Sequence, residues 1–532
     1  MTSGIHHVTL ISGNVQANVD FYVGFLGLRL VKRTGGYEDA RQLHLFYGDY
    51  NAEPGSLITF LVWEGGGRGQ AGAGQVSELA LAIAPGSIGY WLERAIRHQV
   101  QVEGSSQEFG EPVLRLRDPD GVVIKLVGAA LPALVMPESD IPSEHAIRRI
   151  HGVTLLSEVQ EETVGFLRQY FGFRTGASEG TTQRMVSDIG DVLDIRDASG
   201  FWPGAPGTGT ADHVAVRATD AAAVESVEQA LRQRNSSLTN LHDRNYFTSL
   251  YVREPGGVLI EMASDGPGFI KDESVEALGT TLFVPPDEQD KAEDIKVMLP
   301  QFGLPGDERV VYRDLIYTHR FFTPEMPSGR TLLLMHGTGG DEADLMPLAH
   351  RADPHATLLG LRGRSVESGT QRWFRSLGPT LFDQKDIAFE SGALTAFMDE
   401  TRSAYGLDFE QTVAIGYSNG ANFLAAAMLL QPDLLIRKAV LLRPVPVLSA
   451  VPKADLSGRQ VLIIAGENDA YRSKSEELAQ VLEQAGATVQ FEVVSVTHEL
   501  TPRDPEVIAG WLGEQQYRKL IPNLDALTRI KY

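Results

Sequence analysis

Three polar side chains, His7, His213 and Glu261, interrupt apolar, strand-like segments in the first half of the chain. Glu261 lies in residues 243–264, where two runs rich in Tyr, Val, Leu and Ile flank a Pro-Gly-Gly turn typical of a β-hairpin. A carboxylate in such a run is either an outward-facing residue or a ligand, because a buried unpaired carboxylate is costly. Two imidazoles and one carboxylate are donors that hold a divalent metal and leave coordination positions open.

An internal repeat relates these residues to one another. The segment IHHVTLIS at 5–12 recurs as IHGVTLLS at 150–157, residues 117–126 parallel 253–262, and residues 77–81 parallel 212–216. Residues 5–263 therefore read as four similar units, each a strand, a helix and a few more strands, arranged in two halves.

Pairing the first unit with the fourth predicts a metal site on His7, His213 and Glu261, with Phe60 at the fourth position. The matching positions in the second and third units are Glu78, Lys125 and Gly152. Because a lysine stands where a ligand is needed, these two units are expected to lack an equivalent site. The donor set is that of non-haem Fe(II) oxygenases, although Mn(II) accepts it too. The alternative is three unrelated polar residues on strands.

A second group of residues follows the order of a catalytic triad. Gly416-Tyr417-Ser418-Asn419-Gly420 stands between an apolar strand at 412–415 and a helix at 421–430, as a nucleophile turn requires. Asp469 follows the strand 461–465, and His498 follows the strand 489–494. His498 would take the serine proton and Asp469 would hold the imidazole tautomer. Alternatively, Asp469 caps a helix and Glu467 is the acid, or His498 is a surface residue.

The oxyanion site that such a serine needs is predicted from the loop after the first central strand. Residues 336–340 read His-Gly-Thr-Gly-Gly, and the backbone N–H groups of Thr338 and Asn419 are the expected donors. His336 is expected to be structural rather than catalytic.

The elements that would position these groups fall into two fold classes. Residues 1–128 and 147–264 are predicted as α+β halves built from the four units, with a Pro-rich linker at 128–146. Residues 265–307 form a connector, 308–515 an α/β domain of alternating buried strands and helices, and 516–532 a tail without a motif. The expected strands of the α/β domain are 331–335, 357–361, 412–415, 439–442, 461–465 and 489–494.

Composition narrows the setting. The 532 residues contain no cysteine, which excludes disulfides and thiolate chemistry and agrees with a cytoplasmic location. The net charge of −22 argues against binding nucleic acid through its phosphates. No apolar run is long enough to cross a membrane, and the start of the sequence has no signal-peptide pattern. A homo-oligomer is compatible with the sequence.

Residues 4–300 resemble the vicinal-oxygen-chelate superfamily, and more closely its ring-cleaving dioxygenases that act on hydroquinones. The resemblance rests on residues 6–9 (HHVT), the fourfold unit, 31–34 (VKRT), 243–244 (DR), 251–253 (YVR), 257–264 (GVLIEMAS) and 268–269 (GF). It implies Fe(II), or Mn(II), on the three ligands, with dioxygen and a small aromatic compound as substrates. Isomerases and aromatic-binding proteins of the superfamily are the alternatives.

The same resemblance implies roles for residues around the metal. Arg244 would offset negative charge on the substrate, and Tyr251 would donate a hydrogen bond to bound oxygen. The alternatives are that Arg244 is a solvated turn residue and that Tyr251 packs against a neighbouring strand. The family often has a histidine just before its second ligand, where this chain has Asp212. If that histidine is the acid–base catalyst of the family, either Asp212 is expected to replace it or the range of substrates differs. His6 is the nearest other candidate, with a structural histidine as its alternative.

Residues 330–512 resemble α/β-hydrolases of the carboxylesterase and phospholipase-like type, also in the loops 360–364 and 372–374. A bifunctional enzyme is therefore expected: extradiol-type cleavage of a substituted hydroquinone, then hydrolysis of a C–C or ester bond in the product. The alternative is an esterase that first releases the phenol, or a non-dioxygenase module fused to an independent carboxylesterase.

Overall fold

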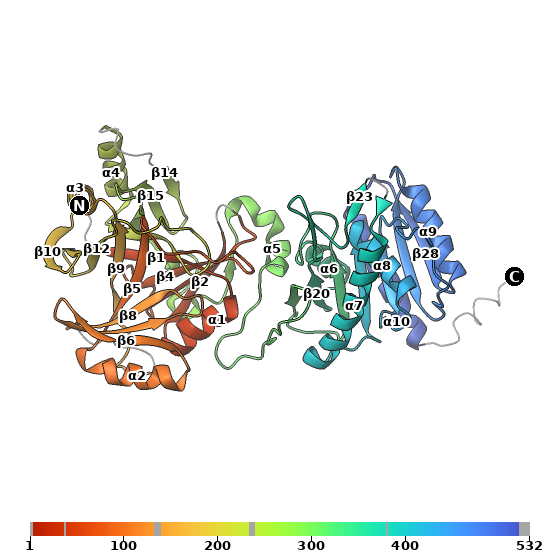
Figure 1. Cartoon of the computed structure of the whole chain (residues 1–532), viewed down its shortest axis with the longest axis horizontal. Helices are drawn as coiled ribbons and strands as arrows, with labels where there is room; N and C mark the ends of the chain where they lie inside the picture. The colour runs from red at the N-terminus through yellow and green to blue at the C-terminus, as the bar shows by residue number, and fades with distance from the viewer. Residues whose placement is uncertain (1–3, 37–38, 132–139, 234–239, 379–380, 521–532) are drawn as a thin grey trace. The chain divides into compact units, whose positions relative to one another are not determined.

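The computed structural model describes residues 4–36, 39–131, 140–233, 240–378 and 381–520, with side chains up to 513. The chain divides into two compact units, residues 1–292 with 302–309, and residues 293–301 with 310–532. Figure 1 shows a sheet-rich first unit and a second unit in which helices cover a central sheet. Part of the predicted linker, residues 132–139, lies outside the described residues.

Two large sheets form the first unit, and each joins two of the four repeats. The nine-stranded sheet runs in the order β14 (Asn240–Asp243), β15 (Phe247–Arg253), β16 (Leu259–Pro267), β13 (Ala211–Ala218), β1 (Ile5–Ser12), β4 (Leu57–Val62), β3 (Leu43–Gly48), β2 (Arg29–Gly35) and β17 (Leu282–Phe283). Antiparallel pairing of β1 with β13 joins the first repeat to the fourth. The predicted pairing and the predicted hairpin, β15 with β16, are both present.

The eight-stranded sheet joins the second repeat to the third through β5 and β9. Its order is β10 (Arg174–Glu179), β11 (Thr182–Val186), β12 (Val192–Asp197), β9 (Arg149–Ser157), β5 (Gln75–Ile83), β8 (Val123–Gly128), β7 (Glu111–Arg117) and β6 (Gln101–Glu108). One helical segment accompanies each repeat: α1 (Val15–Val19) with the π-turn Asp20–Phe25, α2 (Ile88–Arg97), α3 (Gln160–Phe171) and α4 (Ala221–Gln233).

The second unit is a three-layer α/β domain. Its seven-stranded sheet runs β18 (His319–Phe322), β20 (Thr357–Leu361), β19 (Thr331–Met335), β25 (Thr412–Tyr417), β26 (Lys438–Leu442), β27 (Gln460–Gly466) and β28 (Thr488–Val494), all parallel except β18. These bounds agree with the six expected strands to within two residues. Parallel strands are buried on both faces, which explains why the sequences of these strands are apolar throughout.

Alternate residues of these strands enter two separate cores. One core contains Leu333 and Ile463 with α7 (Gln384–Tyr405), α8 (Asn419–Leu430) and α9 (Arg472–Gln484). The other contains Leu334 and Ile464 with α6 (Met346–Ala352) and α10 (Arg503–Leu520). The helix α10 continues past residue 515, where the sequence placed the start of a tail. The short connector helix α5 (Ala292–Met298) packs Val297 into the second core.

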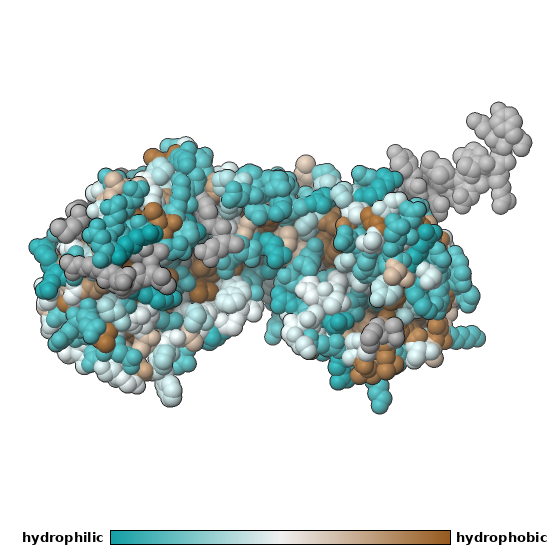
Figure 2. All heavy atoms as spheres, turned by 90° about the horizontal axis from the view of Figure 1, so that it is seen from above, coloured by the Kyte–Doolittle hydropathy of each residue, from teal (hydrophilic) through white to brown (hydrophobic). Residues whose placement is uncertain are grey.

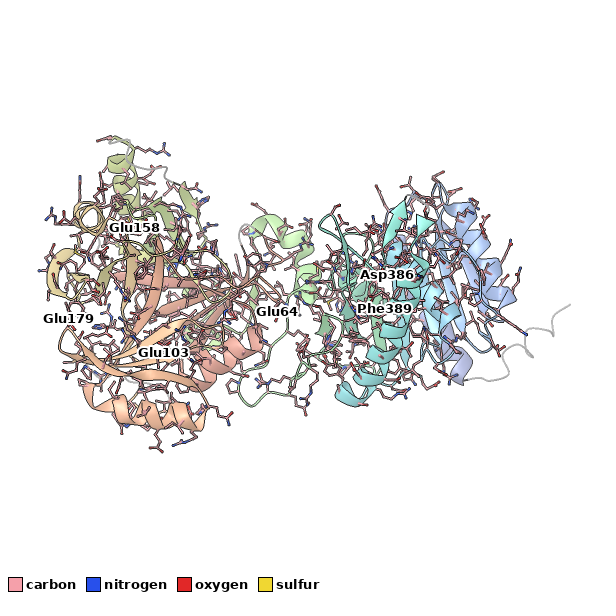
Figure 3. The ribbon with its side chains drawn as sticks, in the orientation of Figure 1. Glu64, Glu103, Glu158, Glu179, Asp386 and Phe389 are labelled. Carbon is pink, nitrogen blue, oxygen red and sulfur yellow. The ribbon has the colours of Figure 1, made fainter. Side chains whose placement is uncertain are left out.

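The face of the molecule seen in Figure 2 is mostly hydrophilic, with apolar side chains in small groups. Glu103, Glu158 and Glu179 are exposed on the first unit and Phe389 is 64% exposed on α7 (Figure 3). No helix in the described part of the chain is long and apolar enough to span a bilayer.

Candidate functional site

Three neighbouring strands of the nine-stranded sheet bring His7, His213 and Glu261 together. Glu261 Oε2 lies 2.8 Å from His213 Nε2 and 3.2 Å from His7 Nε2, and the two Nε2 atoms are 3.3 Å apart. All three side chains are buried. Ligand atoms of these residues lie within 4.8 Å of one another, so one cation can contact all of them. The three predicted ligands therefore share one point in space.

The electrostatics of this cluster fit a divalent cation. Glu261 Oε2 is buried and accepts no hydrogen bond of good geometry, although both Nε2 atoms are near it. Burial would raise the pKa of Glu261, but His7 and His213 hold it well below its usual range. Burial lowers the pKa of His7. Carboxylate and neutral imidazole are the forms that bind a metal, so the residues present suit one.

Each imidazole is oriented by a contact to its outer nitrogen. Nδ1 of His7 lies 2.9 Å from Nδ1 of His6, and Nδ1 of His213 lies 2.7 Å from Asp212 Oδ2. Burial lowers the pKa of His213, but hydrogen bonds to Asp212 and Glu261 outweigh this and raise it to about 9. A cation would take the place of that proton. Contacts of this kind direct the inner nitrogens towards a metal, so Asp212 and His6 have a geometric role whatever their part in proton transfer.

The fourth position of the site differs from the prediction. In the pair of strands β13 and β16, the residue opposite Glu261 is Ala215, which comes two residues after His213. In the equivalent pair, β1 and β4, the residue two positions after His7 is Thr9, and the residue opposite it is Thr59. The equivalent of Glu261 is therefore Thr59 and not Phe60.

Phe60 is fully buried on the other face of the sheet, with its ring 4.6 Å from that of Tyr22. Neighbouring residues of a strand point to opposite faces, so an error of one residue changes the face. Thr59 Oγ1 contacts Thr9 Oγ1 at 2.9 Å and His44 Nε2 at 3.0 Å.

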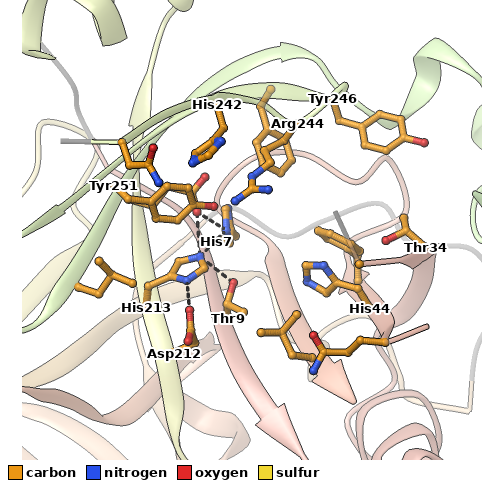
Figure 4. Close-up of a pocket in the computed structure, with 18 of the residues that line it drawn as sticks. His7, Thr9, Thr34, His44, Asp212, His213, His242, Arg244, Tyr246 and Tyr251 are labelled. Carbon is orange, nitrogen blue, oxygen red and sulfur yellow. Dashed lines mark hydrogen bonds and ion pairs between the residues drawn. The ribbon is translucent and has the colours of Figure 1, made fainter. Parts of the chain in front are cut away.

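A cavity of about 700 Å³ opens above the three ligands. Arg244 and Tyr251, both predicted, line it, and Tyr251 is directly opposite Glu261 in the hairpin. The Arg244 guanidinium lies 5.4 Å from the Tyr251 ring. Figure 4 shows Arg244, Tyr251 and His242 converging above His7 and His213. Asp212 also lines the cavity, whereas His6 lies behind the ligands and is not among its lining residues.

Several residues that line the cavity were not predicted from the sequence. They include His44, Phe46, His242, Tyr246 and Phe247. His44 and Phe46 lie on β3 and His242 on β14, strands that carry no motif. Strand alternation is the one signal that could have indicated them, once the register with β4 and β15 was known.

The equivalent positions of the other sheet hold an internal ion network. Lys125, which is buried, lies 3.0 Å from Glu78 and 3.2 Å from Glu108. Arg184 binds Asp194, the residue opposite Thr154. An ammonium group thus occupies the place of a ligand, as the sequence predicted.

In the second unit, the predicted triad has hydrogen-bonding geometry. His498 Nε2 lies 2.9 Å from Ser418 Oγ, and His498 Nδ1 lies 2.8 Å from Asp469 Oδ2. Ser418 has φ 49° and ψ −113°, a conformation rare for a residue with a side chain and typical of a nucleophile turn. Glu467, the alternative acid, instead accepts a hydrogen bond from Ser495.

The turn around Ser418 is packed closely enough to require glycine. A Cβ on Gly420 would lie 2.2 Å from the carbonyl oxygen of Met335, at the end of β19. Asn419 begins α8 and accepts a hydrogen bond from the backbone N–H of Trp373 through Oδ1. Thr338 is exposed in the loop that follows β19, next to the turn. The two predicted oxyanion donors thus lie on adjoining loops.

His336 has the structural position that was expected. It is buried, and its Nε2 accepts a hydrogen bond from the backbone N–H of Gly363 at 2.9 Å.

Comparisons with known proteins separate the two units. The family model "Glyoxalase/Bleomycin resistance protein/Dioxygenase superfamily" matches residues 4–126. The first half of the chain is 35% identical to "Putative ring-cleaving dioxygenase MhqO" of Bacillus subtilis, over 53% of this chain and 91% of that protein. It is also 35% identical to "Chlorohydroquinone/hydroquinone 1,2-dioxygenase" of Sphingobium indicum, again over 53% and 91%.

A solved structure of a B. subtilis protein described as a dioxygenase matches 57% of this chain and 98% of its own length, with 34% identity and a TM-score of 0.55. The rest of the chain has a different relative. It is 36% identical to "Putative hydrolase MhqD" of B. subtilis, over 35% of this chain and 94% of that protein. The two activities named for separate proteins in B. subtilis are thus matched here by two units of one chain.

Proposed function

Because the chain belongs to the ring-cleaving dioxygenase family in its first unit and joins it to a hydrolase-family unit, we propose that it cleaves a substituted hydroquinone with dioxygen and then hydrolyses the product. The observation that carries the first step is the buried cluster of two Nε2 atoms and one carboxylate oxygen at the floor of a 700 Å³ cavity. Hydroquinones are the compounds named for the Sphingobium relative.

In this proposal His7, His213 and Glu261 hold Fe(II) or Mn(II). The metal supplies binding and activation of dioxygen next to the aromatic substrate. The chain's own residues have supporting tasks: Asp212 and His6 fix the two imidazoles. Arg244 and Tyr251 face the substrate and stabilise negative charge on its oxygen atoms.

Ring opening defines what the second unit would receive. Cleavage between a hydroxyl-bearing carbon and an adjacent carbon bearing a substituent gives a carboxylic acid at one end and a ketone at the other. The remaining hydroxyl becomes an enol, which tautomerises to a second ketone one carbon away from the first. The product is a β-diketone, a compound whose central carbon can leave as a stabilised carbanion.

The triad can hydrolyse such a bond. Ser418 Oγ adds to one carbonyl while His498 takes its proton, and the C–C bond to the central carbon breaks. His498 returns the proton to that carbon, and water then releases the acyl group from the serine. N–H groups of Thr338 and Asn419 stabilise the oxyanion. The overall change adds one water and yields a carboxylic acid and a ketone.

The test uses protein reconstituted with Fe(II) without oxygen and then mixed with methylhydroquinone and dioxygen. Wild type should consume oxygen, and the ultraviolet band of the diketone should be transient. In Ser418→Ala the oxygen uptake should continue while the band persists. An identical band in both proteins would refute the hydrolytic step for this substrate. No oxygen uptake by metal-loaded wild type with methylhydroquinone, chlorohydroquinone or catechol would refute the ring-cleaving step.

A further inference from the structure

His242 carries a buried nitrogen that has no use within the fold. Its Nε2 is shielded from solvent and has no hydrogen-bond partner among the residues that the structure describes. The side chain lines the cavity above the three metal-ligand candidates, and Figure 4 shows the ring pointing into it. Buried polar groups in proteins are almost always paired, so an unpaired one that faces a cavity indicates a ligand.

The sheet places His242 at a defined distance from the ligands. On β14, His242 is opposite Ser249 of β15, and Ser249 donates a hydrogen bond to Glu261 Oε1 at 2.5 Å. Tyr251 is opposite Glu261, and its ring centroid lies 6.0 Å from that of His242. His242 is thus two strands from β16, or roughly 10 Å at the usual strand spacing. Its place on β14 puts it farther from Glu261 than Tyr251 is.

A 1,4-diol has one oxygen at each end of its ring. If one oxygen is held at the ligand cluster, the other projects away from it, towards the far wall. His44 is the other histidine of the cavity wall, but its Nε2 already contacts Thr59 Oγ1 at 3.0 Å. His242 Nε2, by contrast, has no hydrogen-bond partner among the described residues and is available to a second substrate oxygen.

We propose that His242 determines specificity for 1,4-diols: a turn of its ring brings Nε2 from its shielded position to the cavity surface, where it forms a hydrogen bond to the substrate hydroxyl that is not at the ligand cluster. This inference rests on the proposed function and extends it by naming the residue that separates a hydroquinone from a simple phenol. A site built to bond a hydroxyl discriminates strongly against an analogue that lacks it, because its own polar group is then left unpaired.

The experiment compares two ligands that differ only in that hydroxyl, methylhydroquinone and 2-methylphenol. Binding to Fe(II)-loaded protein is measured by calorimetry without oxygen, so that no turnover occurs. The proteins are wild type, His242→Phe, His242→Gln and, as a matched control, His98→Phe, at an exposed histidine after α2 that does not line the cavity. Thermal melting verifies that each variant is folded.

Wild type should bind methylhydroquinone about tenfold more tightly than 2-methylphenol, the usual effect of one hydrogen bond. His242→Phe should lose this preference by weakening methylhydroquinone alone. His242→Gln should retain part of it, and His98→Phe should leave the ratio unchanged.

Two results would overturn the assignment in distinguishable ways. If wild type binds and cleaves methylhydroquinone and folded His242→Phe keeps the full preference, His242 is not the specificity residue while the proposed function stands. If metal-loaded wild type binds neither compound and consumes no oxygen with hydroquinones, the proposed function fails and the role of His242 fails with it.

Discussion

Substitution of Arg443 should destabilise the second unit more than any surface change, because it breaks an ion pair with no access to water. The side chains of Arg443 and Asp504 are both fully buried and joined by two hydrogen bonds of 2.8 and 3.0 Å. Arg443 Nη2 also donates to the carbonyl oxygen of Glu499 at 2.8 Å. Glu499 directly follows His498, so the pair supports the loop that carries the triad histidine.

The size of the effect follows from what each substitution leaves behind. Arg443→Met leaves Asp504 buried and charged, with only Thr501 still donating to it, at 2.7 Å from the backbone N–H and 3.2 Å from the hydroxyl. Removal of one partner of a buried pair costs about 3–5 kcal/mol. The double variant Arg443→Met/Asp504→Asn leaves no isolated charge, so it should cost clearly less than the sum of the two single variants.

The assay must report on the second unit alone. Hydrogen–deuterium exchange of peptides from β26 and β27, followed across a urea series, gives the free energy of opening of that core. Hydrolysis of a p-nitrophenyl ester by the same variants should show a lower kcat with little change in KM, because His498 loses its support. The reasoning would be refuted if either single variant lowered the free energy of unfolding by less than about 1 kcal/mol. It would also be refuted if the loss in the double variant equalled the sum of the losses in the two single variants.

Three further outcomes are expected. Ser418→Ala should lower ester hydrolysis by at least about 10³-fold and leave the melting temperature unchanged, since it removes the nucleophile and no packing. A chelator should lower the melting temperature of the first unit only. The lost stabilisation should be about 2.7 kcal/mol if the metal was present at 100 times its Kd before the chelator was added. The chelator should have no effect on the His213→Ala variant, which lacks one of the three proposed ligands. Burial and the nearby Asp120 raise the pKa of Asp118 to about 7. Folded protein then binds more protons than unfolded protein between about pH 4 and 7, so stability falls as pH rises through that window. Asp118→Asn keeps the acceptor for the N–H of Val122 and should therefore stabilise the protein at pH 8 relative to wild type, with no such gain at pH 4, as urea unfolding would measure.

The sequence predicted the site best where a repeat or a motif fixed the register. The recurrence of the first strand in the third unit, with the Pro-Gly turns, was enough to predict that His7, His213 and Glu261 form one cluster, as they do in the structure. Strands of the second unit were recognisable because each is a short, continuous apolar run that is buried on both faces. The order of serine, aspartate and histidine then placed the triad residues at the ends of those strands.

Prediction failed where no pattern defined the register. Phe60 and Thr59 are neighbours, and only the pairing of β1 with β4 shows that Thr59 faces the cavity. His242 lies on the edge strand β14 and His44 on β3, and the pairing of these strands with the rest of the sheet leaves no trace in the sequence. Packing partners far apart in the chain, such as Arg443 and Asp504, likewise become visible only in three dimensions.

The contrast between the two sheets explains how a duplicated fold can keep one metal site. In the nine-stranded sheet, the equivalent positions gather two imidazoles and a carboxylate, and the charge of that carboxylate is balanced by a proton on His213 that a metal cation can displace. In the eight-stranded sheet, Lys125 itself provides the positive charge and lies within 3.2 Å of Glu78 and Glu108. An internal ammonium neutralises its carboxylates without a metal. The second sheet can therefore serve the fold alone, while the first has a site that a metal cation can fill, and a chelator should therefore act on the first and not on the second.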